Sequence, residues 1–256
     1  MATRKKLTTT QIAREIGVHP NTVRLYEEWG YLQPVPRNPK NNYREFSTEH
    51  LDQMRLAWSA LHADYWHSAK RILVQMVHEA AAGNLGQALE SAYRYASTVR
   101  AETGQAELAV TYLERWALGR PAESTGRTMQ IGEAAEFLGV SRDVLRNWER
   151  NHLLQVPRDP KSGYRLYGAE EIGRLRVIRM LRQAGYSMMA ILRMITAFDR
   201  GEIQNLREVL DTPGENEFLF SAADSWLSTL KACGERAALV ISMLEEMIAR
   251  RSGPAT

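Results

Sequence analysis

Apolar residues recur at helical spacing in two stretches of the chain whose sequences are alike, 17–46 and 139–167. The two stretches align with a single deletion near Pro36, and a repeat of this spacing is too long for a solenoid. Each copy places a short apolar-periodic segment before a glycine and a second such segment after it. The pattern therefore predicts a duplicated domain built on two short helices.

Local signals predict where the helices of the first copy end. The spacing of the apolar residues predicts helices over 9–16 and over 20–28. Gly17 ends the first helix, and the proline at the start of the second needs no N–H there. Gly30 is expected to close the second helix in the left-handed conformation.

The second copy carries equivalent signals at equivalent positions. A helix is predicted over 131–138, with Gly139 after it and Ser141 as the N-cap of a helix that runs through Arg150. Two short helices with a Gly-Val link and a capped start are typical of a helix-turn-helix.

A proline-rich segment follows each helix pair, and a tyrosine-arginine pair comes after it. Proline keeps the flanks at 34–39 and 157–160 extended. The tips at 41–44 and 162–165 contain asparagine or glycine, which tolerate a positive φ. Each copy is therefore predicted to carry a small two-stranded wing.

Two longer segments, 86–118 and 217–250, carry apolar residues at alternating steps of three and four. The first series is Leu89, Ala92, Ala96, Val99, Thr103, Ala106, Val110, Leu113 and Ala117, and the second is Leu219, Ala223, Trp226, Leu230, Cys233, Ala237, Val240, Leu244 and Met247. A seven-residue period sustained over about four heptads predicts a coiled-coil seam. Heptads do not identify their partner, so pairing within one chain and pairing between chains both remain open.

Charge and composition narrow the class of protein. The chain has 256 residues and a net charge of +3, and no apolar run approaches the roughly 18 residues that cross a bilayer. Basic residues outnumber acidic ones in both copies, eight to four over 1–46 and seven to five over 127–167, whereas 202–256 holds five against nine. This asymmetry is expected if the copies face phosphate. The protein is expected to be cytoplasmic, without a membrane partner.

The remaining chemistry is sparse. The single cysteine, Cys233, cannot form an internal disulfide or a thiolate cage, and its place in the seam predicts a small buried side chain. His62, Asp64 and His67 are close in sequence but are expected to be solvent-exposed. No catalytic or phosphate-loop motif is present, so neither enzyme activity nor a cofactor is predicted.

Two further groups have structural interpretations. The basic residues Arg4, Lys5 and Lys6 could form an arm over DNA or a solubilising terminus. Apolar packing is expected for an aromatic group outside the motifs, which comprises Trp58, Tyr65, Trp66, Phe218, Phe220 and Trp226.

Motifs in both copies carry a family resemblance. Val-Arg-x-Tyr-Glu begins at Val23 and Leu-Arg-x-Trp-Glu at Leu145, and each is followed by Pro-Arg and then Tyr-Arg-x-aromatic. The chain thus resembles the MerR family of bacterial transcription regulators, in which a winged helix-turn-helix precedes a long helix that pairs antiparallel in a homodimer. The likeness is strong over 129–195, whereas the first copy departs from the family's helix junction over 61–67.

The resemblance implies a mainly α fold with two winged helix-turn-helix domains, small β wings, and long helices that form an antiparallel coiled coil. The expected divisions are a first winged domain over 7–83, a first long helix over 84–118, a linker over 119–127, a second winged domain over 128–200, and a short connector with the second long helix over 201–252. Because one chain carries two such domains, a monomeric pseudo-dimer is favoured over a homodimer.

The predicted partner is double-stranded DNA. The residues expected to contact it are His19, Asn21, Thr22, Arg24, Tyr26, Arg37, Lys40, Tyr43 and Arg44 in the first copy, and Ser141, Arg142, Asp143, Arg146, Trp148, Arg158, Lys161, Tyr164 and Arg165 in the second. Recognition-helix residues would read bases, while wing arginines and lysines would contact phosphates. Alanine at Arg44 or Arg165 should therefore weaken binding to all sequences and flatten its salt dependence, whereas a change at Arg142 should affect one half-site.

The predicted function is a nucleoid-associated transcription regulator that binds an asymmetric promoter operator, distorts it, and acts with RNA polymerase. Distortion and polymerase contact follow from the resemblance. Two alternatives stay open: an architectural or recombination-accessory DNA-binding protein, and a ligand-binding or protein-interaction module that has lost DNA binding.

Overall fold

The structure, a computed structural model, describes residues 6–62, 67–119, 127–213 and 222–252. Within these ranges the chain forms α-helices joined by turns, and its β-structure is limited to isolated bridges. The predicted mainly α fold is therefore confirmed. The predicted wings are hairpins held by bridges, without a continuous two-stranded ladder.

The chain divides into two compact units, each containing one sequence copy. Unit 1 comprises residues 1–100 and 232–256, and unit 2 comprises residues 101–231. The two long helices, α5 (Leu85–Ala117) and α11 (Trp226–Ser252), each contribute residues to both units. The C-terminal part of α11 thus packs with the first copy.

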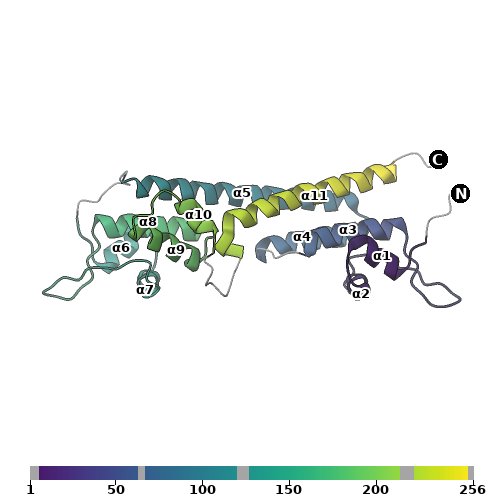
Figure 1. Ribbon diagram of the computed structural model, residues 1–256, viewed down its shortest axis with the longest axis horizontal. Helices are drawn as coiled ribbons and strands as arrows, with labels where there is room; N and C mark the ends of the chain where they lie inside the picture. The colour runs from purple at the N-terminus through teal and green to yellow at the C-terminus, as the bar shows by residue number, and fades with distance from the viewer. Residues whose placement is uncertain (1–5, 63–66, 120–126, 214–221, 253–256) are drawn as a thin grey trace. The chain divides into compact units, whose positions relative to one another are not determined.

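Unit 1 begins with the predicted helix-turn-helix (Figure 1). Its helices before α5 are α1 (Thr9–Ile16), α2 (Pro20–Glu28), α3 (Thr48–Leu61) and α4 (His67–Ala81). Thr8 caps α1 by accepting from the Gln11 backbone N–H, and Gly17 ends it at φ +79°. Gly30 has φ +74°, so the glycine positions that the sequence indicated are confirmed.

Unit 2 repeats this order (Figure 1). Its elements are α6 (Ile131–Leu138), α7 (Arg142–Arg150), α8 (Ala169–Gln183), α9 (Met188–Asp199), α10 (Leu206–Asp211) and a short 3₁₀ helix, η1 (Ala222–Ser225). Ser141 caps α7 as predicted, because its Oγ accepts from the Val144 N–H at 3.2 Å. The sequence did not predict α10, which lies in the segment interpreted as a connector. It also did not predict η1, which includes Ala223 of the expected seam, so the prediction of one helix across this position is wrong and α11 begins at Trp226.

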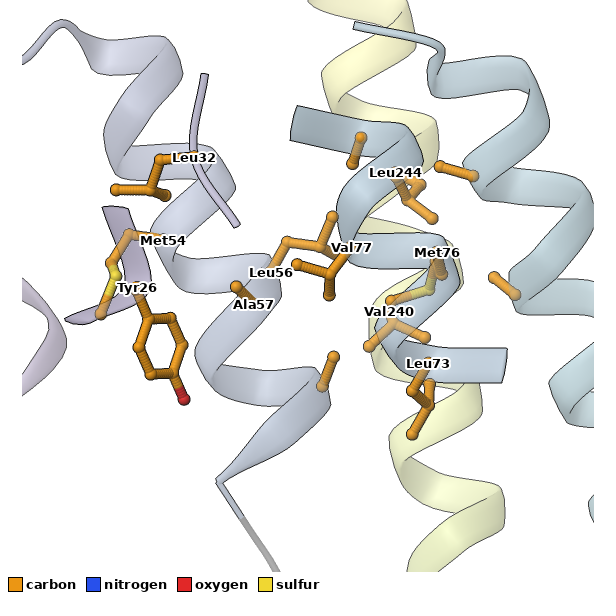
Figure 2. Close-up of a cluster of buried hydrophobic side chains, with 14 of the residues drawn as sticks. Tyr26, Leu32, Met54, Leu56, Ala57, Leu73, Met76, Val77, Val240 and Leu244 are labelled. Carbon is orange, nitrogen blue, oxygen red and sulfur yellow. The ribbon is translucent and has the colours of Figure 1, made fainter. Parts of the chain in front are cut away.

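The core of unit 1 joins the winged domain to both long helices. Figure 2 shows side chains of α3 (Leu56, Ala57), α4 (Leu73, Met76, Val77) and α11 (Val240, Leu244) meeting in this core. Ala92 and Val99 of α5 belong to the same core, as does Cys233, which is 2% exposed. The expected burial of the cysteine is confirmed.

Two tryptophans pack within unit 2, Trp116 half-buried and Trp226 buried. The Trp116 ring of α5 lies 4.2 Å, between centroids, from Phe198 of α9. Trp226 is buried, and its Nε1–H donates to the Ala184 carbonyl oxygen at 2.6 Å. The packing role expected for Trp226 is confirmed.

The remaining aromatic, histidine and N-terminal basic residues lie in different settings. Trp58 is half-buried beside Tyr26, with ring centroids 6.1 Å apart, and His62 is exposed. Arg4, Lys5, Asp64, Tyr65, Trp66, Phe218, Leu219 and Phe220 lie outside the described residues, and the His67 side chain is not described. No helix in the described ranges has the length and apolarity that a membrane crossing requires.

A buried histidine caps α3. The His50 Nδ1 accepts from the Ser47 backbone N–H at 2.9 Å, so this nitrogen carries no proton in the cap. Burial lowers the His50 pKa, and the nearby Glu49 and Glu27 oppose this shift without reversing it. Protonation would remove the acceptor and weaken the start of α3.

A pH-dependent contribution to stability follows from this cap. Because the folded-state pKa of His50 is below its unfolded value of about 6.5, its contribution is complete above that pH and is lost as pH falls through the folded pKa. We expect His50→Gln to reduce the loss of unfolding free energy between pH 7.5 and 5.5, by at most about 1 kcal/mol. Urea denaturation at both pH values measures this difference. Equal losses in the two proteins would contradict the assignment.

Candidate nucleic-acid interface

The helix α2 has one buried and one exposed face. Val23 and Tyr26 point into the core and are 0% and 5% exposed. The exposed residues follow the helical spacing i, i+3, i+4 and i+7, and they are Asn21, Arg24, Leu25 and Glu28. We call this set the α2 stripe.

The helix α7 is built in the same way. Leu145 and Trp148 are buried at the positions that correspond to Val23 and Tyr26. The exposed set, here called the α7 stripe, comprises Asp143, Arg146, Asn147 and Arg150. The two stripes occupy matched positions but differ in chemistry, because the second has two arginines where the first has one.

The first turn of each stripe contains the same side-chain contact. The Arg24 guanidinium donates to the Asn21 Oδ1 at 2.9 Å, and the Arg146 guanidinium donates to the Asp143 Oδ1 at 2.9 Å. In the second copy this contact is an ion pair, so the carboxylate that faces outward is neutralised locally. Both arginines are exposed and keep further N–H donors available.

The N-caps hold two of the predicted base-reading residues close to the backbone. The His19 Nδ1 accepts from the Asn21 N–H at 3.2 Å, and Ser141 caps α7 as described above. The Arg142 side chain lies against α6. Its Nη2 is 2.9 Å from the position that a Cβ on Gly132 would occupy. In this conformation Arg142 is exposed but folded against its own domain.

Two residues predicted to contact DNA belong to the core. The exposed fractions of Tyr26 and Trp148 are 5% and 6%. The Tyr26 ring packs edge-on against Tyr31, with centroids 5.4 Å apart. These side chains are largely buried and pack beneath the recognition helix, and a contact between them and DNA stays a prediction.

Each wing is a hairpin closed at its tip and at its base. In the first copy the Asn38 N–H donates to the Tyr43 carbonyl oxygen at 2.8 Å, and the Asn42 N–H donates to the Asn38 carbonyl oxygen at 2.8 Å. Asp159, Gly163 and Tyr164 make the same bonds in the second copy. The tip residues Asn42 and Gly163 have φ +58° and +72°, which confirms the positive φ that the sequence predicted.

Polar side chains stiffen both tips. The Asp159 Oδ1 accepts from the backbone N–H groups of Ser162 at 2.7 Å and Lys161 at 2.9 Å, and these bonds lower the pKa of the Asp159 carboxyl. In the first copy the Asn38 Oδ1 accepts from the Lys40 N–H at 2.9 Å. Hydrogen bonds from Lys6 and Asn38 lower the pKa of Glu45 in that wing.

The wing surfaces are basic and aromatic. Exposed residues of the first wing are Arg37, Lys40 and Tyr43, and those of the second are Arg158, Lys161 and Tyr164. Tyr43 is 73% exposed and Tyr164 is 63% exposed, so both rings are accessible to a partner. Thr22, in the first turn of α2, is half-buried.

The arginines that follow these tyrosines have a different setting. The Arg165 Nε donates to the Glu149 Oε2 of α7 at 2.6 Å, and Arg44 makes the same contact with Glu27 of α2. The exposed fractions of these side chains are 28% and 22% in the second copy, and 21% and 17% in the first. Each pair therefore joins a wing to its recognition helix. A charged hydrogen bond at such exposure is worth more than a fully solvated pair.

Comparison with known proteins agrees with this geometry. The profile described as the MerR HTH family regulatory protein matches residues 7–65 and 129–197, which together make up half of the chain. The chain belongs to the MerR family. The two matched regions coincide with the two winged helix-turn-helix copies, so the tandem arrangement is confirmed.

Curated MerR-type relatives align with only part of their length. A mercuric resistance operon regulatory protein from Bacillus cereus is 32% identical over 73 residues, which are 28% of this chain and 55% of the relative. A probable heavy metal-dependent transcriptional regulator from Haemophilus influenzae is 35% identical over 81 residues, 32% of this chain and 62% of the relative. The repressor CarH from Myxococcus xanthus is 29% identical over 75 residues, 29% of this chain and 25% of the relative. No solved structure matches the chain significantly.

The sequence interpretation missed several exposed residues of the MerR-type recognition helices. Leu25 is 42% exposed and Trp29 is 53% exposed, although both are large and apolar. Asn147 and Asn151 occupy the matching places in the second copy, and both are exposed. The signal was available, because Leu25 and Asn147 lie four residues after Asn21 and Asp143, and positions four apart share a helix face.

Proposed function

We propose that the protein is a sequence-specific DNA-binding transcription regulator whose two winged units read an asymmetric operator. The observation that carries the proposal is the difference between the α2 and α7 stripes, which occupy matched positions on the two recognition helices. A homodimer would present two identical stripes and favour a palindrome. Two unlike stripes favour two unlike half-sites.

The stripe chemistry suggests what each half-site contains. Leu25 offers an apolar surface suited to a thymine methyl group, whereas Asn147 offers the amide that pairs with the N6 and N7 of adenine. Asn151 supports this role, because its Nδ2 donates to the Asn147 Oδ1 at 3.2 Å and to the Asn147 carbonyl oxygen at 2.8 Å. The net charge of α7 is also more positive, which favours tighter phosphate approach in the second half-site.

The proposal includes the pseudo-dimer within one chain. It is supported by the shared core of unit 1, where Ala92 and Val99 of α5 lie with Val240 and Leu244 of α11. In this arrangement 7–83 and 128–200 act as the two DNA-binding domains, and the exposed stripe and wing residues form their contacts. Promoter distortion, contact with RNA polymerase and association with the nucleoid are parts of the same proposal.

Selection of bound sites from random DNA tests the proposal directly. We expect an asymmetric consensus, salt-sensitive binding, and a complex whose molar mass corresponds to one chain per duplex. A palindromic consensus bound by two chains would refute the pseudo-dimer, and the lack of any selected sequence would refute sequence-specific binding. Footprinting of the selected site should show enhanced cleavage at its centre if the operator is distorted.

Exchange of one stripe residue should change one half-site. We expect Asn147→Leu to abolish the preference for one base pair in the second half-site, a loss of about 1 to 3 kcal/mol of discrimination, and to leave the first half-site unchanged. Arg100→Met is a control that removes an exposed charge from α5. Repeating the selection with both variants measures the effect, and equal changes in both half-sites would contradict the assignment.

A further inference from the structure

Each unit contains a joint where a long helix meets the helix that follows the wing, and the two joints differ in chemistry. Gly173 of α8 corresponds to Asp52 of α3 in the aligned copies. In unit 2 the Trp116 Nε1 is 3.0 Å from the place a Cβ on Gly173 would occupy. In unit 1 the Asp52 carboxylate instead pairs with Arg250 of α11 at 2.7 Å. An aromatic ring therefore closes one joint and an ion pair closes the other.

A cavity lies beside the ion pair of unit 1. Its volume is about 410 Å³, within the range of small-molecule sites. Ala80, Leu85 and Met247 give it an apolar part, and its polar lining includes Arg250 and Arg251 of α11. The corresponding hollow in unit 2 has a volume of about 310 Å³ and no lining residue from α5. A ligand in unit 1 would therefore touch the long helix, whereas one in unit 2 would not.

The cavity of unit 1 is lined by two carboxylates and two guanidinium groups, and Arg251 is the guanidinium that no carboxylate pairs with among the described residues. Its carboxylates are engaged, because Asp52 lies between Arg250 and Arg55, and Glu49 accepts from the Gln33 side-chain amide at 3.4 Å. The Arg251 guanidinium makes one hydrogen bond within the described part of the chain, to the Gly83 carbonyl oxygen at 2.7 Å. A guanidinium has five N–H donors, so Arg251 retains donors for a planar carboxylate.

We propose that this cavity binds a small organic carboxylate. Its carboxylate group contacts Arg250 and Arg251, and its hydrocarbon part packs on Ala80, Leu85 and Met247. Binding of the carboxylate does not require DNA. A regulatory effect of that binding rests on the proposed function.

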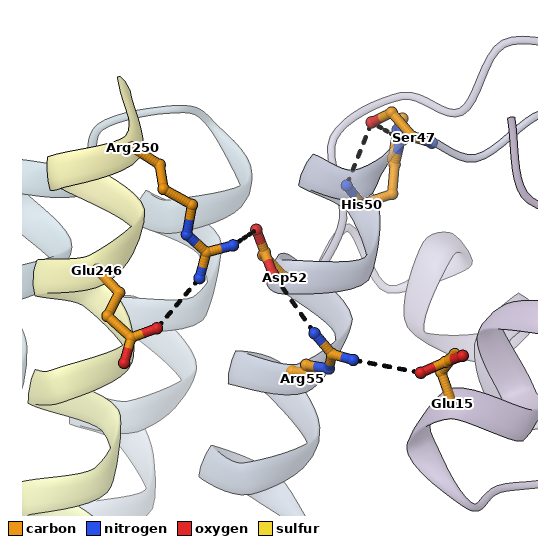
Figure 3. Close-up of polar contacts among 7 residues, drawn as sticks. All are labelled: Glu15, Ser47, His50, Asp52, Arg55, Glu246 and Arg250. Atoms are coloured by element: carbon orange, nitrogen blue, oxygen red, sulfur yellow. Dashed lines mark hydrogen bonds and ion pairs between the residues drawn. The ribbon is translucent and has the colours of Figure 1, made fainter. Parts of the chain in front are cut away.

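A chain of ion pairs connects the cavity to the helix-turn-helix (Figure 3). It runs from Glu246 to Arg250 at 3.1 Å, from Arg250 to Asp52, from Asp52 to Arg55 at 3.8 Å, and from Arg55 to Glu15 of α1 at 3.4 Å. A ligand carboxylate that competes for Arg250 breaks the ion pair between Arg250 and Asp52. Asp52 then pairs with Arg55 only, which changes the setting of the ion pair between Arg55 and Glu15 of α1. Ligand binding and DNA binding would then influence each other in both directions.

The residues at the equivalent positions of unit 2 have a different chemistry. Arg176, which corresponds to Arg55, lies over the Phe137 ring at 4.9 Å from its centroid, and Phe137 corresponds to Glu15. Gly173 provides no carboxylate between Arg176 and the long helix. The carboxylate response is thus confined to unit 1.

Ligand-detected NMR and calorimetric titration of the full chain test the site with 4-methylpentanoate. The control probe, 3-methylbutylamine, has the same hydrocarbon body and the opposite charge. We expect the carboxylate to bind with a Kd on the order of 1 mM. Arg251→Met should raise this Kd about tenfold through loss of a charged hydrogen bond. Lys70→Met, which removes an exposed charge on α4, should leave it unchanged.

A joint exchange provides a second test. The double variant Asp52→Gly/Arg250→Trp copies the aromatic joint of unit 2 and should abolish binding, with folding checked by circular dichroism. Equal binding of the amine, no binding of the carboxylate to the wild type, or unchanged binding in Arg251→Met would each overturn the proposal. DNA affinity measured without the probe is a separate readout. If the wild-type protein does not bind DNA, the proposed function is refuted, while the carboxylate titration still shows whether the cavity binds a ligand.

Discussion

Replacing Gly185 with alanine is expected to lower the free energy of unfolding by about 3 kcal/mol. Gly185 lies between α8 and α9 at φ +99°, and an added Cβ would be 2.8 Å from the Trp226 Nε1. The indole cannot withdraw easily, because Trp226 is buried and its N–H is bonded to the Ala184 carbonyl oxygen. The substitution therefore combines an unfavourable backbone conformation with a steric clash.

Gly201→Ala is the matched control for this substitution. Gly201 also follows a helix and has φ +81°, but a Cβ there meets no atom within 4 Å among the described residues. Its cost should be limited to backbone strain, about 1 to 2 kcal/mol. Urea unfolding followed by circular dichroism measures both variants. Equal losses would show that the contact with Trp226 contributes nothing, and Trp226→Leu should reduce the excess cost of Gly185→Ala.

Features set by local chemistry were predictable from the sequence. The ends of α1, α2, α6 and α7 agree with the predicted ranges because caps and left-handed glycines depend on a few neighbouring residues. Gly17 and Gly139 have φ +79° and +62° for this reason. The wing tips were predictable in the same way, since asparagine or glycine stands where the chain reverses.

Features set by distant contacts were not predictable. The pairing of Arg44 with Glu27 joins residues 17 apart, and nothing in a wing sequence separates an arginine that holds the wing from one that contacts phosphate. Burial of Tyr26 is a different case, because its spacing from Val23 indicated the core face. The family motif drew attention to the ring as a DNA contact instead.

The contacts between the long helices and α3 or α8 could not be predicted from the duplication. The sequence alignment matches Asp52 with Gly173 and Glu15 with Phe137, and nothing in the sequence links these two differences. In the structure, Asp52 and Gly173 both lie where a long helix meets its winged domain, and Glu15 and Phe137 both contact the arginine one turn further along α3 or α8. Duplication thus preserved the frame of the winged domain, while the contacts at its joint diverged.

Glu27→Met is expected to weaken DNA binding about tenfold, although it removes a negative charge from the recognition helix. Electrostatic repulsion alone predicts tighter DNA binding by this variant, because a carboxylate repels phosphate. The loss is expected because Glu27 holds Arg44, and Arg44 holds the wing against α2. Fluorescence anisotropy with the selected duplex measures the affinity.

The neighbouring residue supplies the control. Glu28 is an exposed residue of the α2 stripe and makes no ion pair within the described part of the chain, so Glu28→Met removes a carboxylate that repels phosphate without releasing the wing and should raise affinity slightly. The salt dependence separates two roles of Arg44. A variant that only displaces the wing keeps most of the slope of log K against log salt, whereas loss of a phosphate contact flattens it by about 0.9. We therefore expect Arg44→Met to flatten the slope more than Glu27→Met. Tighter binding by Glu27→Met would show that its carboxylate acts through charge alone and that the wing needs no such support.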